Sequence, residues 1–277
     1  MKIINLIEDT KGREECVAAH GLSFYAETKK HKLLLDLGPS SQTIDNAKAL
    51  GIDLTEIDTV ILSHGHYDHS GGIIPFTKIN DKANIYFQES AMEDYYADDG
   101  MEAKERYRYI GVDKAIVFLP QAKILNGDAK IDGEIEVFTI KERSHKLPST
   151  NKNLLIKKDG EFERDGFGHE HFLVIREEGK SVLLSGCAHN GILSILDAYI
   201  EKFGVAPDLV VSGFHLMKKT EYNESEIEEI KDIAKELKKY PSRFVTCHCT
   251  SVPAYEIMKP VLGEQLEYVH SGEEIKF

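Results

Sequence analysis

Residues 64–69 read His-Gly-His-Tyr-Asp-His, and this short run limits what the chain can fold into more than any other feature. Three imidazoles and one carboxylate would be costly to bury in a hydrophobic core. Both groups are ligands for first-row metal ions. In an extended loop, His64 and His66 point to the same side and can share one metal. Asp68 and His69 follow directly and can turn toward a second metal, whereas the alternative is a solvated histidine-rich turn.

The charge of the chain limits its partners. The formal net charge is −13, and a polyanion needs clustered lysines and arginines to bind it. We therefore expect no nucleic-acid partner. Two bound dications would offset part of the negative charge locally, so a small anionic substrate remains compatible with this composition.

Cysteine usage and hydropathy indicate the compartment. The cysteines at positions 16, 187, 247 and 249 form no CxxC pair, which argues against a zinc ribbon. The first nine residues contain no long apolar region of the kind found in signal peptides. No stretch approaches the roughly 20 apolar residues that cross a bilayer. We expect a cytoplasmic protein with free thiols and no membrane partner.

Hydrophobic periodicity predicts alternating strands and helices along the whole chain, which is typical of an α/β or an α+β fold. The clearest helix covers residues 223–240, where Asn223 and Glu226 have the spacing of a capping box. Two further helices are predicted at 43–50 and 191–203. The predicted strands cover residues 2–7, 22–26, 32–37, 59–63, 84–88, 134–140, 154–157, 171–176, 181–185, 208–211 and 243–247.

The segment Glu89–Asp113 differs from its surroundings because it is rich in tyrosine, methionine and charge. It is either an ordinary helical insertion on the surface or a cap over the site. Aromatic and methionine side chains suit an adaptable substrate wall, which is the argument for the cap. Both alternatives stay open.

The run HGHYDHSGG resembles the HxHxDH signature of the metallo-β-lactamase superfamily of metal-dependent hydrolases. The resemblance extends to residues 19–23, 33–38, 186–191, 213–216 and 247–250. These segments are similar to one branch, which includes an archaeal dihydropterin-methyl-ribofuranosylaminobenzene-phosphate synthase. The resemblance implies one domain over residues 1–277 with a four-layer αββα sandwich. It also implies two divalent metal ions, with Zn²⁺ first and Mn²⁺ or Fe²⁺ as alternatives.

The resemblance also suggests ligands in the second half of the chain. Cys187 occupies the place of a ligand to the second metal, although a small buried side chain is the alternative. His248 matches the last metal histidine of the superfamily. One ligand position stays open among four histidines, ranked in the order His189, His171, His169 and His145. Cys247 and Cys249 flank His248 and are expected to point away from it by strand alternation.

Several other residues match positions around the metal site of the relatives. Asp36 is the candidate for a carboxylate that orients a ligating imidazole. His20 and His215 are candidates for substrate contact, and His215 is also a candidate catalytic residue. Lys218 and Lys219 could attract an anion, but paired lysines after a loop are usually solvated.

The predicted reaction is hydrolysis of a small ester, lactone or phosphoester by a metal-bound hydroxide, with Asp68 as metal ligand and proton acceptor. One alternative is a transferase that joins a dihydropterin pyrophosphate to a ribofuranosylaminobenzene phosphate. A second alternative is a non-catalytic metal-binding or ligand-binding module. Redox chemistry at di-iron is disfavoured because the corresponding relatives carry a carboxylate where this chain has His66.

Overall fold

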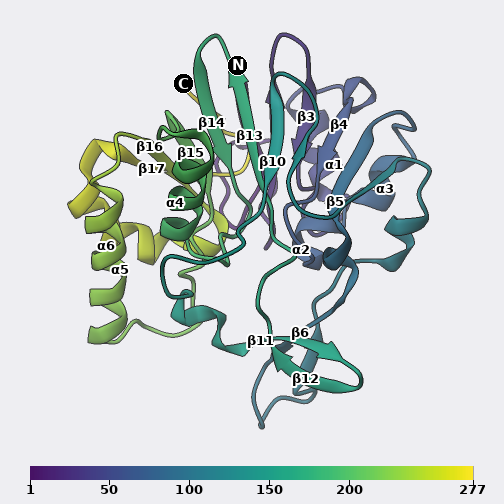
Figure 1. Ribbon diagram of the computed structural model, residues 1–277. Helices are drawn as coiled ribbons and strands as arrows, with labels where there is room; N and C mark the ends of the chain where they lie inside the picture. Colours follow the sequence, from purple (N-terminus) through teal and green to yellow (C-terminus); the bar gives the residue numbers. More distant parts are fainter. Residues whose placement is uncertain (277) are drawn as a thin grey trace.

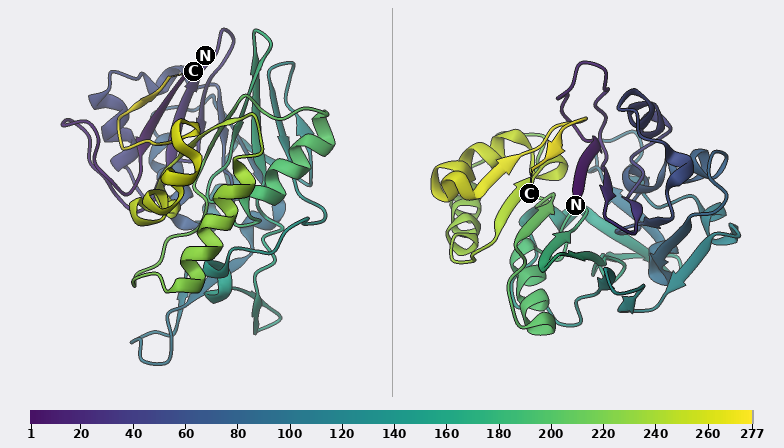
Figure 2. Two further views of the ribbon diagram at one scale, coloured as in Figure 1. Left: turned by 90° about the vertical axis from the view of Figure 1, so that its left-hand side faces the viewer. Right: turned by 90° about the horizontal axis from the view of Figure 1, so that it is seen from above.

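A computed structural model describes residues 1–276, and two seven-stranded sheets lie face to face at its centre (Figures 1 and 2). The first sheet has the strand order β18 (Glu274–Ile275), β1 (Lys2–Ile7), β2 (Ser23–Glu27), β3 (Lys32–Leu35), β4 (Thr59–Ile61), β5 (Asn84–Gln88) and β8 (Ala122–Leu125). The second has the order β17 (Leu266–Tyr268), β16 (Arg243–Thr246), β15 (Leu209–Ser212), β14 (Lys180–Leu184), β13 (Phe172–Glu177), β10 (Ile135–Phe138) and β9 (Ala129–Lys130).

Helices cover the outer face of each sheet, as the view from above shows (Figure 2). The first sheet carries α1 (Gln42–Ala49) and α3 (Ile73–Thr77), and the second carries α4 (Ile192–Phe203), α5 (Glu224–Leu237) and α6 (Val252–Leu262). The short helix α2 (Tyr67–Ser70) lies at one end of the sheets. None of the helices in residues 1–276 combines the length and the apolar run that crossing a bilayer requires.

Three separate hydrophobic cores account for this layering. One core fills the space between the sheets and includes Phe24, Leu173 and Val211. The other two lie between each sheet and its own helices. Strands such as β3 are apolar and buried on both faces, as expected for sheets that are covered on both sides. The predicted α/β sandwich with four layers is confirmed.

Helix α5 begins where the sequence predicts it. Asn223 is the N-cap, its Oδ1 accepts the backbone N–H of Glu226 at 3.0 Å, and Glu226 Oε2 accepts the N–H of Asn223 at 2.8 Å. This reciprocal pair is the predicted capping box. The helix ends at Leu237 rather than at residue 240.

Of the two alternatives for 89–113, the helical insertion is wrong, because this segment forms strands β6 (Asp94–Asp98) and β7 (Tyr107–Tyr109). They join β11 (Leu154–Lys158) and β12 (Glu161–Arg164) in a four-stranded sheet below α2 (Figure 1). The aromatic residues alternate between its faces: Tyr95 is buried, whereas Tyr96 packs against Phe162 on the other side. Aromatic side chains suit such a pleated surface, which the tyrosine count alone did not reveal.

The short connections of the fold are η1 (Leu54–Glu56), η2 (Glu89–Met92), η3 (Lys114–Phe118), η4 (Ser149–Asn153), η5 (His248–Thr250) and η6 (Gly263–Gln265). Parallel strand pairs occur in both large sheets and include β3–β4, β14–β15 and β15–β16. The loops that follow these strands therefore meet at one end of the sandwich, on the side of the small sheet.

His31 connects the two large sheets at the opposite end and gives a pH-dependent prediction. Its Nδ1 lies 2.9 Å from Asp58 Oδ1, and its Nε2 lies 2.9 Å from Asp132 Oδ2 in the β9–β10 turn. Burial acts to lower the pKa of His31, but the hydrogen bonds to Asp132 and Asp58 outweigh it and raise that pKa. The stabilisation is therefore complete below the ordinary histidine pKa and is lost as the pH rises through the raised value.

We expect His31→Gln to lower the free energy of unfolding by about 1 kcal/mol at pH 6 and by much less at pH 9. Urea unfolding of both proteins at the two pH values measures this difference. His145→Gln is the control, because His145 has a single carboxylate partner, Asp197, and both side chains are 39% exposed. Equal losses for His31→Gln at both pH values would contradict the charged bridge.

Candidate metal centre

The loop after β4 carries the histidine-rich run into the end of the sandwich. His66 has extended backbone and is the N-cap of α2, so Asp68 and His69 lie on the first turn of that helix. All four metal-type side chains of the run are buried, from fully for His64 and His69 to 8% exposed for Asp68. Their burial argues against a solvated turn.

The first group of donors consists of His64, His66 and His189, whose ligand atoms all lie within 4.8 Å of one another. His64 Nε2 lies 3.0 Å from His66 Nδ1 and 3.3 Å from His189 Nε2. Two nitrogens bound to one tetrahedral zinc ion at about 2.0–2.1 Å lie about 3.3 Å apart. The spacing of these three imidazoles therefore fits one shared metal ion.

Hydrogen bonds assign the proton of His64 to Nδ1. The Ser63 hydroxyl donates its single proton to Asp36 Oδ2 at 2.7 Å, because a carboxylate only accepts. Ser63 Oγ must then accept from His64 Nδ1, which lies 2.8 Å away. The lone pair of His64 is consequently on Nε2, the atom that faces His189.

The same reasoning applies to His189. Asn151 Nδ2 donates to the carbonyl of His189, and Asn151 Oδ1 lies 3.0 Å from His189 Nδ1 and accepts its proton. The lone pair of His189 is therefore also on Nε2. Two lone pairs that face each other at 3.3 Å repel unless a cation lies between them. This geometry indicates a metal ion.

The second group of donors consists of Asp68, His69, Cys187 and His248. His69 Nε2 lies 3.2 Å from Cys187 Sγ, and Asp68 Oδ2 lies 3.6 Å from His69 Nε2 and 3.5 Å from His248 Nε2. The Nε2 atom of His248 is buried without a hydrogen-bond partner. A thiolate, a carboxylate and two imidazoles form a donor set that suits zinc, so these residues fit a second ion.

Carboxylates fix the imidazoles of this group as well. Asp36 Oδ2 lies 2.6 Å from His69 Nδ1, and Asp9 Oδ1 bonds to His248 Nδ1. Each carboxylate accepts the Nδ1 proton and leaves the lone pair of Nε2 directed to the centre of the group. Asp36 thus takes the place that the sequence suggested for it, whereas Asp9 was missed.

Burial sets the protonation of the first group. It lowers the pKa of His66 to about 3 and brings those of His64 and His189 well below the ordinary value. These imidazoles are neutral at pH 7, which is the form that binds metal. Burial acts to raise the pKa of Asp68, but His69, His248 and His20 together hold it below its ordinary value. The first group therefore offers neutral imidazoles, and the ionised carboxylate of Asp68 lies in the second group. There burial acts to lower the pKa of His248, but hydrogen bonds to Asp68 and Asp9 outweigh it and raise that pKa.

The three remaining candidates for the open ligand position are not grouped with both His64 and His66, although His169 lies near His66 and Asp165. His169 uses both ring nitrogens, because Nδ1 accepts the N–H of Gly65 at 3.0 Å and Nε2 lies 3.0 Å from Asp165 Oδ2. His169 therefore binds the backbone of the histidine-rich loop at Gly65. His171 Nδ1 lies 3.0 Å from Gln88 Nε2, which can only donate, so this nitrogen is an acceptor.

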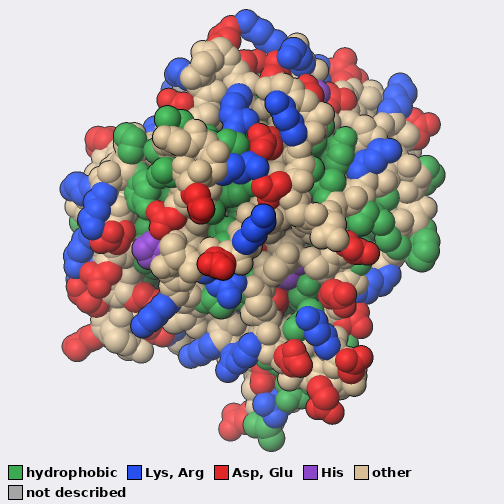
Figure 3. All heavy atoms as spheres, in the orientation of Figure 1, with side chains coloured by type: hydrophobic (Ala, Val, Ile, Leu, Met, Phe, Trp, Pro, Cys, Tyr) green, Lys and Arg blue, Asp and Glu red, His purple; other side chains and the backbone are tan. Residues whose placement is uncertain are grey.

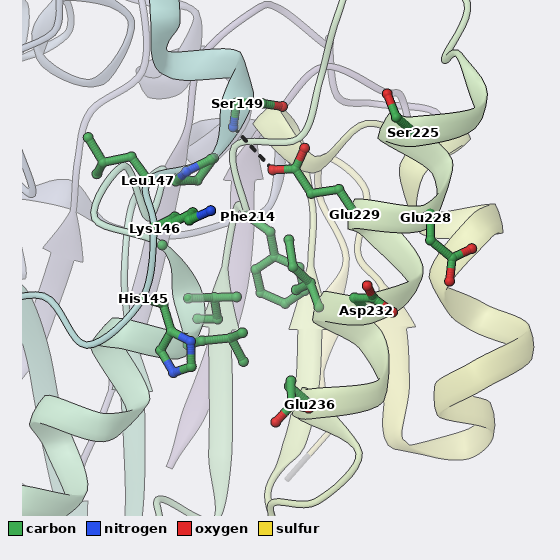
Figure 4. Close-up of a pocket in the computed structure, with 15 residues that line it drawn as sticks. His145, Lys146, Leu147, Ser149, Phe214, Ser225, Glu228, Glu229, Asp232 and Glu236 are labelled. Atoms are coloured by element: carbon green, nitrogen blue, oxygen red, sulfur yellow. Dashed lines mark hydrogen bonds between the residues drawn. The ribbon is translucent and has the colours of Figure 1, made fainter.

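His145 lines a different cavity of about 820 Å³, between the segment 145–149 and helix α5 (Figure 4). Acidic side chains of α5 stand on the far side of this cavity, and Glu229 accepts a hydrogen bond from the N–H of Ser149. His145 Nε2 pairs with Asp197. The structure therefore brings together His189, and not His145, with His64 and His66.

The prediction that Cys249 points away from His248 is wrong. The ligand atoms of Cys187, His248 and Cys249 lie within 4.8 Å of one another. Strand alternation fails here because β16 ends at Thr246 and residues 248–250 form the turn η5, with a positive φ of 49° at His248. Cys247 does pack in the core between the sheets, as predicted.

The two histidines suggested for substrate contact lie at the edge of the site. His20 is half exposed, with Nδ1 2.8 Å from Asp9 Oδ2 and Nε2 3.7 Å from Asp68 Oδ2. The ring of His215 lies 4.1 Å from that of His189, and its Nδ1 is 3.1 Å from Thr150 Oγ1. Burial lowers the pKa of His215 to about 3, so it is a neutral hydrogen-bonding group at pH 7.

A cavity of about 510 Å³ opens onto these residues. Its lining includes members of both donor groups, namely His66 and His189 of the first and Asp68, Cys187 and His248 of the second. Arg108 of β7, the adjacent Ile110 and Lys219 from the loop after β15 also line it. The side chain of Arg108 is 43% exposed, whereas Cys187 and His189 are almost fully buried. The cavity therefore runs from buried donors to charged residues at its mouth, and sequence reasoning did not identify Arg108.

Comparison with known proteins agrees with this geometry. Residues 18–236 match the family described as the metallo-beta-lactamase superfamily. The chain is 28% identical to the 7,8-dihydropterin-6-methyl-4-(beta-D-ribofuranosyl)-aminobenzene-5'-phosphate synthase of Methanocaldococcus jannaschii, over all of this chain and 97% of that protein. It is also 29% identical to an uncharacterized protein of the same archaeon, over 78% of this chain and 80% of that one.

A solved structure extends the comparison to three dimensions. The chain superposes with a TM-score of 0.82 on a metal-dependent hydrolase of the beta-lactamase superfamily, with 27% identity and coverage of 100% of this chain and 99% of that one. The family match spans well over half of the chain, and the fold and the donor residues agree with it. The chain therefore belongs to the metallo-beta-lactamase superfamily.

Proposed function

We propose that the protein is a dinuclear metal-dependent hydrolase that acts on a small ester, lactone or phosphoester. The observation that carries this proposal is the pair of Nε2 lone pairs of His64 and His189, which face each other at 3.3 Å. When bound, two divalent ions supply Lewis acidity and lower the pKa of a water molecule to about 7. His64, His66 and His189 would hold one ion, and Asp68, His69, Cys187 and His248 the other.

The donor types support zinc as the metal. The seven proposed ligands are five imidazoles, one thiolate and one carboxylate, all of which bind zinc readily, and the thiolate of Cys187 favours zinc over manganese. Iron(II) is the nearest alternative, because imidazole and carboxylate also suit it.

Asp68 and His215 have separate roles in the proposed reaction. Asp68 is ionised and lies between His20, His69 and His248, so its carboxylate can accept a proton at the centre of the site. His215 is neutral and faces the cavity, where its ring can hydrogen-bond to a substrate oxygen. A cavity of about 510 Å³ suits a small molecule.

The second candidate function is a transferase. It is favoured by the full-length similarity to the archaeal synthase, whose name describes a phosphate-bearing pterin product. In that reaction the same residues would hold metal ions that activate a pyrophosphate leaving group instead of a water molecule. Incubation of metal-loaded protein with the dihydropterin pyrophosphate and the ribofuranosylaminobenzene phosphate, followed by mass spectrometry, distinguishes coupling from hydrolysis.

The hydrolase proposal is tested by removing and restoring metal. Purified protein is analysed for metal per chain, stripped with a chelator, and assayed on esters, lactones and phosphoesters before and after Zn²⁺, Mn²⁺ or Fe²⁺ is added back. We expect about two ions per chain and activity that returns only with metal. Two bound ions without turnover of any substrate class would favour a non-catalytic metal-binding module instead.

We also propose a cytoplasmic protein without a nucleic-acid partner. Lysine and arginine side chains are interspersed with aspartate and glutamate on the face shown in Figure 3, rather than gathered in one basic region. All four cysteines are free and buried, which suits a reducing compartment.

A further inference from the structure

Two basic residues stand at the mouth of the metal cavity although the chain as a whole carries a formal charge of −13. Arg108 comes from strand β7 of the small sheet, and Lys219 comes from the loop between β15 and α5. They thus reach the cavity from two different parts of the fold.

Asp99 holds Arg108 in place. Arg108 Nε donates to Asp99 Oδ2 at 2.7 Å, and Nη2 donates to Asp99 Oδ1 at 3.3 Å. An arginine carries five N–H donors in one plane, so donors remain for a second anion while this pair fixes the plane of the guanidinium. Hydrogen bonds from Arg108 lower the pKa of Asp99, and the charge of Lys219 adds to this effect. Arg108 and Lys219 both line the same cavity.

Lys219 differs from its neighbour Lys218. Lys218 Nζ is paired with Glu226 at 2.6 Å, whereas Lys219 makes no ion pair within residues 1–276 and is exposed. Of the two lysines, only Lys219 lines the metal cavity. Its ammonium is therefore available to an anion that enters this cavity.

We propose that Arg108 and Lys219 form an anion-binding pair that receives a phosphate group of the substrate remote from the reacting bond. A planar arginine fork and a lysine point charge together match a phosphate dianion better than a single carboxylate. The buried donors Cys187 and His189 lie deeper in the cavity, so a molecule held at its mouth by phosphate presents its other end to them. This inference rests on the proposed hydrolase function for the position of the reacting bond.

The test uses two carboxylic esters that differ only in a remote phosphonate, whose C–P bond resists hydrolysis. Arg108→Gln and Lys219→Gln should each raise KM for the phosphonate ester about tenfold and leave kcat nearly unchanged. Turnover of the neutral ester should stay within about twofold of wild type. An equal loss on both esters would overturn the proposal, because it would indicate a structural role.

The chain offers matched controls. Arg106 lies on the same hairpin as Arg108 but pairs with Asp98 and does not line the cavity, and Lys218 is the corresponding control for Lys219. Arg106→Gln and Lys218→Gln should leave both esters unaffected. If the control variants raised KM for the phosphonate ester as much as the test variants do, the effect would come from net charge alone. The assignment of Arg108 and Lys219 as an anion-binding pair would then be rejected.

A binding measurement separates this proposal from the proposed function. Calorimetry with methylphosphonate and with acetate on metal-free protein requires no turnover. We expect methylphosphonate to bind the wild type, to bind Arg108→Gln and Lys219→Gln about tenfold more weakly, and to exceed acetate in affinity. Acetate binding as tightly as methylphosphonate, or equal affinity in the variants, would overturn the assignment even if no ester is ever hydrolysed.

Discussion

Alanine in place of His189 should remove about one of two metal ions per chain and lower turnover by more than about a hundredfold. The loss follows from geometry, because His189 Nε2 is 3.3 Å from His64 Nε2 and its other nitrogen is held by Asn151. Outer partners of metal ligands already cost 10- to 100-fold when they are replaced, so the loss of a ligand should exceed that range. Elemental analysis and steady-state rates on the same preparation measure both effects.

His171→Ala is the control for this experiment. His171 is equally buried and was also a candidate ligand, but its Nδ1 accepts from Gln88 and it lies outside the group of His64 and His66. We expect His171→Ala to keep both metal ions, at some cost in stability. Retention of metal in His189→Ala together with loss in His171→Ala would reverse the assignment of the third ligand.

The second large effect is expected at Asp36, because one carboxylate orders two imidazoles. It accepts from His69 directly and from His64 through the hydroxyl of Ser63, and it also accepts the N–H of Ser63 at 2.7 Å. Asp36→Ala would leave these buried donors without a partner, which costs about 3–5 kcal/mol in the free energy of unfolding. The φ of 61° at this position adds strain of roughly 1 kcal/mol for alanine.

Asp36→Asn separates stability from metal affinity. Asparagine tolerates a positive φ and keeps one accepting oxygen, so the metal-free variant should be less destabilised than Asp36→Ala in urea unfolding. It cannot accept from both His69 and Ser63 as the carboxylate does, and its metal affinity should fall about 10- to 100-fold. Wild-type metal affinity in Asp36→Asn would mean that Asp36 does not orient the ligands.

The sequence predicted the first half of the site better than the second. The spacing of His64, His66, Asp68 and His69 is local, so a single loop after a strand is enough to gather them. The choice among the later histidines depends on which ring nitrogen is free. That is decided by partners far along the chain, such as Asn151 for His189 and Asp165 for His169.

The fold shows the same division between local and distant causes. Strands with a strong apolar run, such as β1 and β5, have the predicted bounds. Helix α6 was not predicted from the sequence; it carries Pro253 in its first turn, where proline is compatible with a helix, and Pro260 near its end. The small sheet was missed because β6 owes its pairing to β11, about 60 residues later, and no local pattern indicates that partner.

The pairing of β6 with β11 has a consequence for how proteins of this architecture can diversify. The hairpin β6–β7 is inserted between β5 and β8 of the first sheet, and β11–β12 is inserted between β10 and β13 of the second. Tyr95 and Ile156 face each other across the join. To transfer this small sheet to another protein, two separate stretches of gene would therefore have to move together, because either stretch alone lacks the strands with which it pairs.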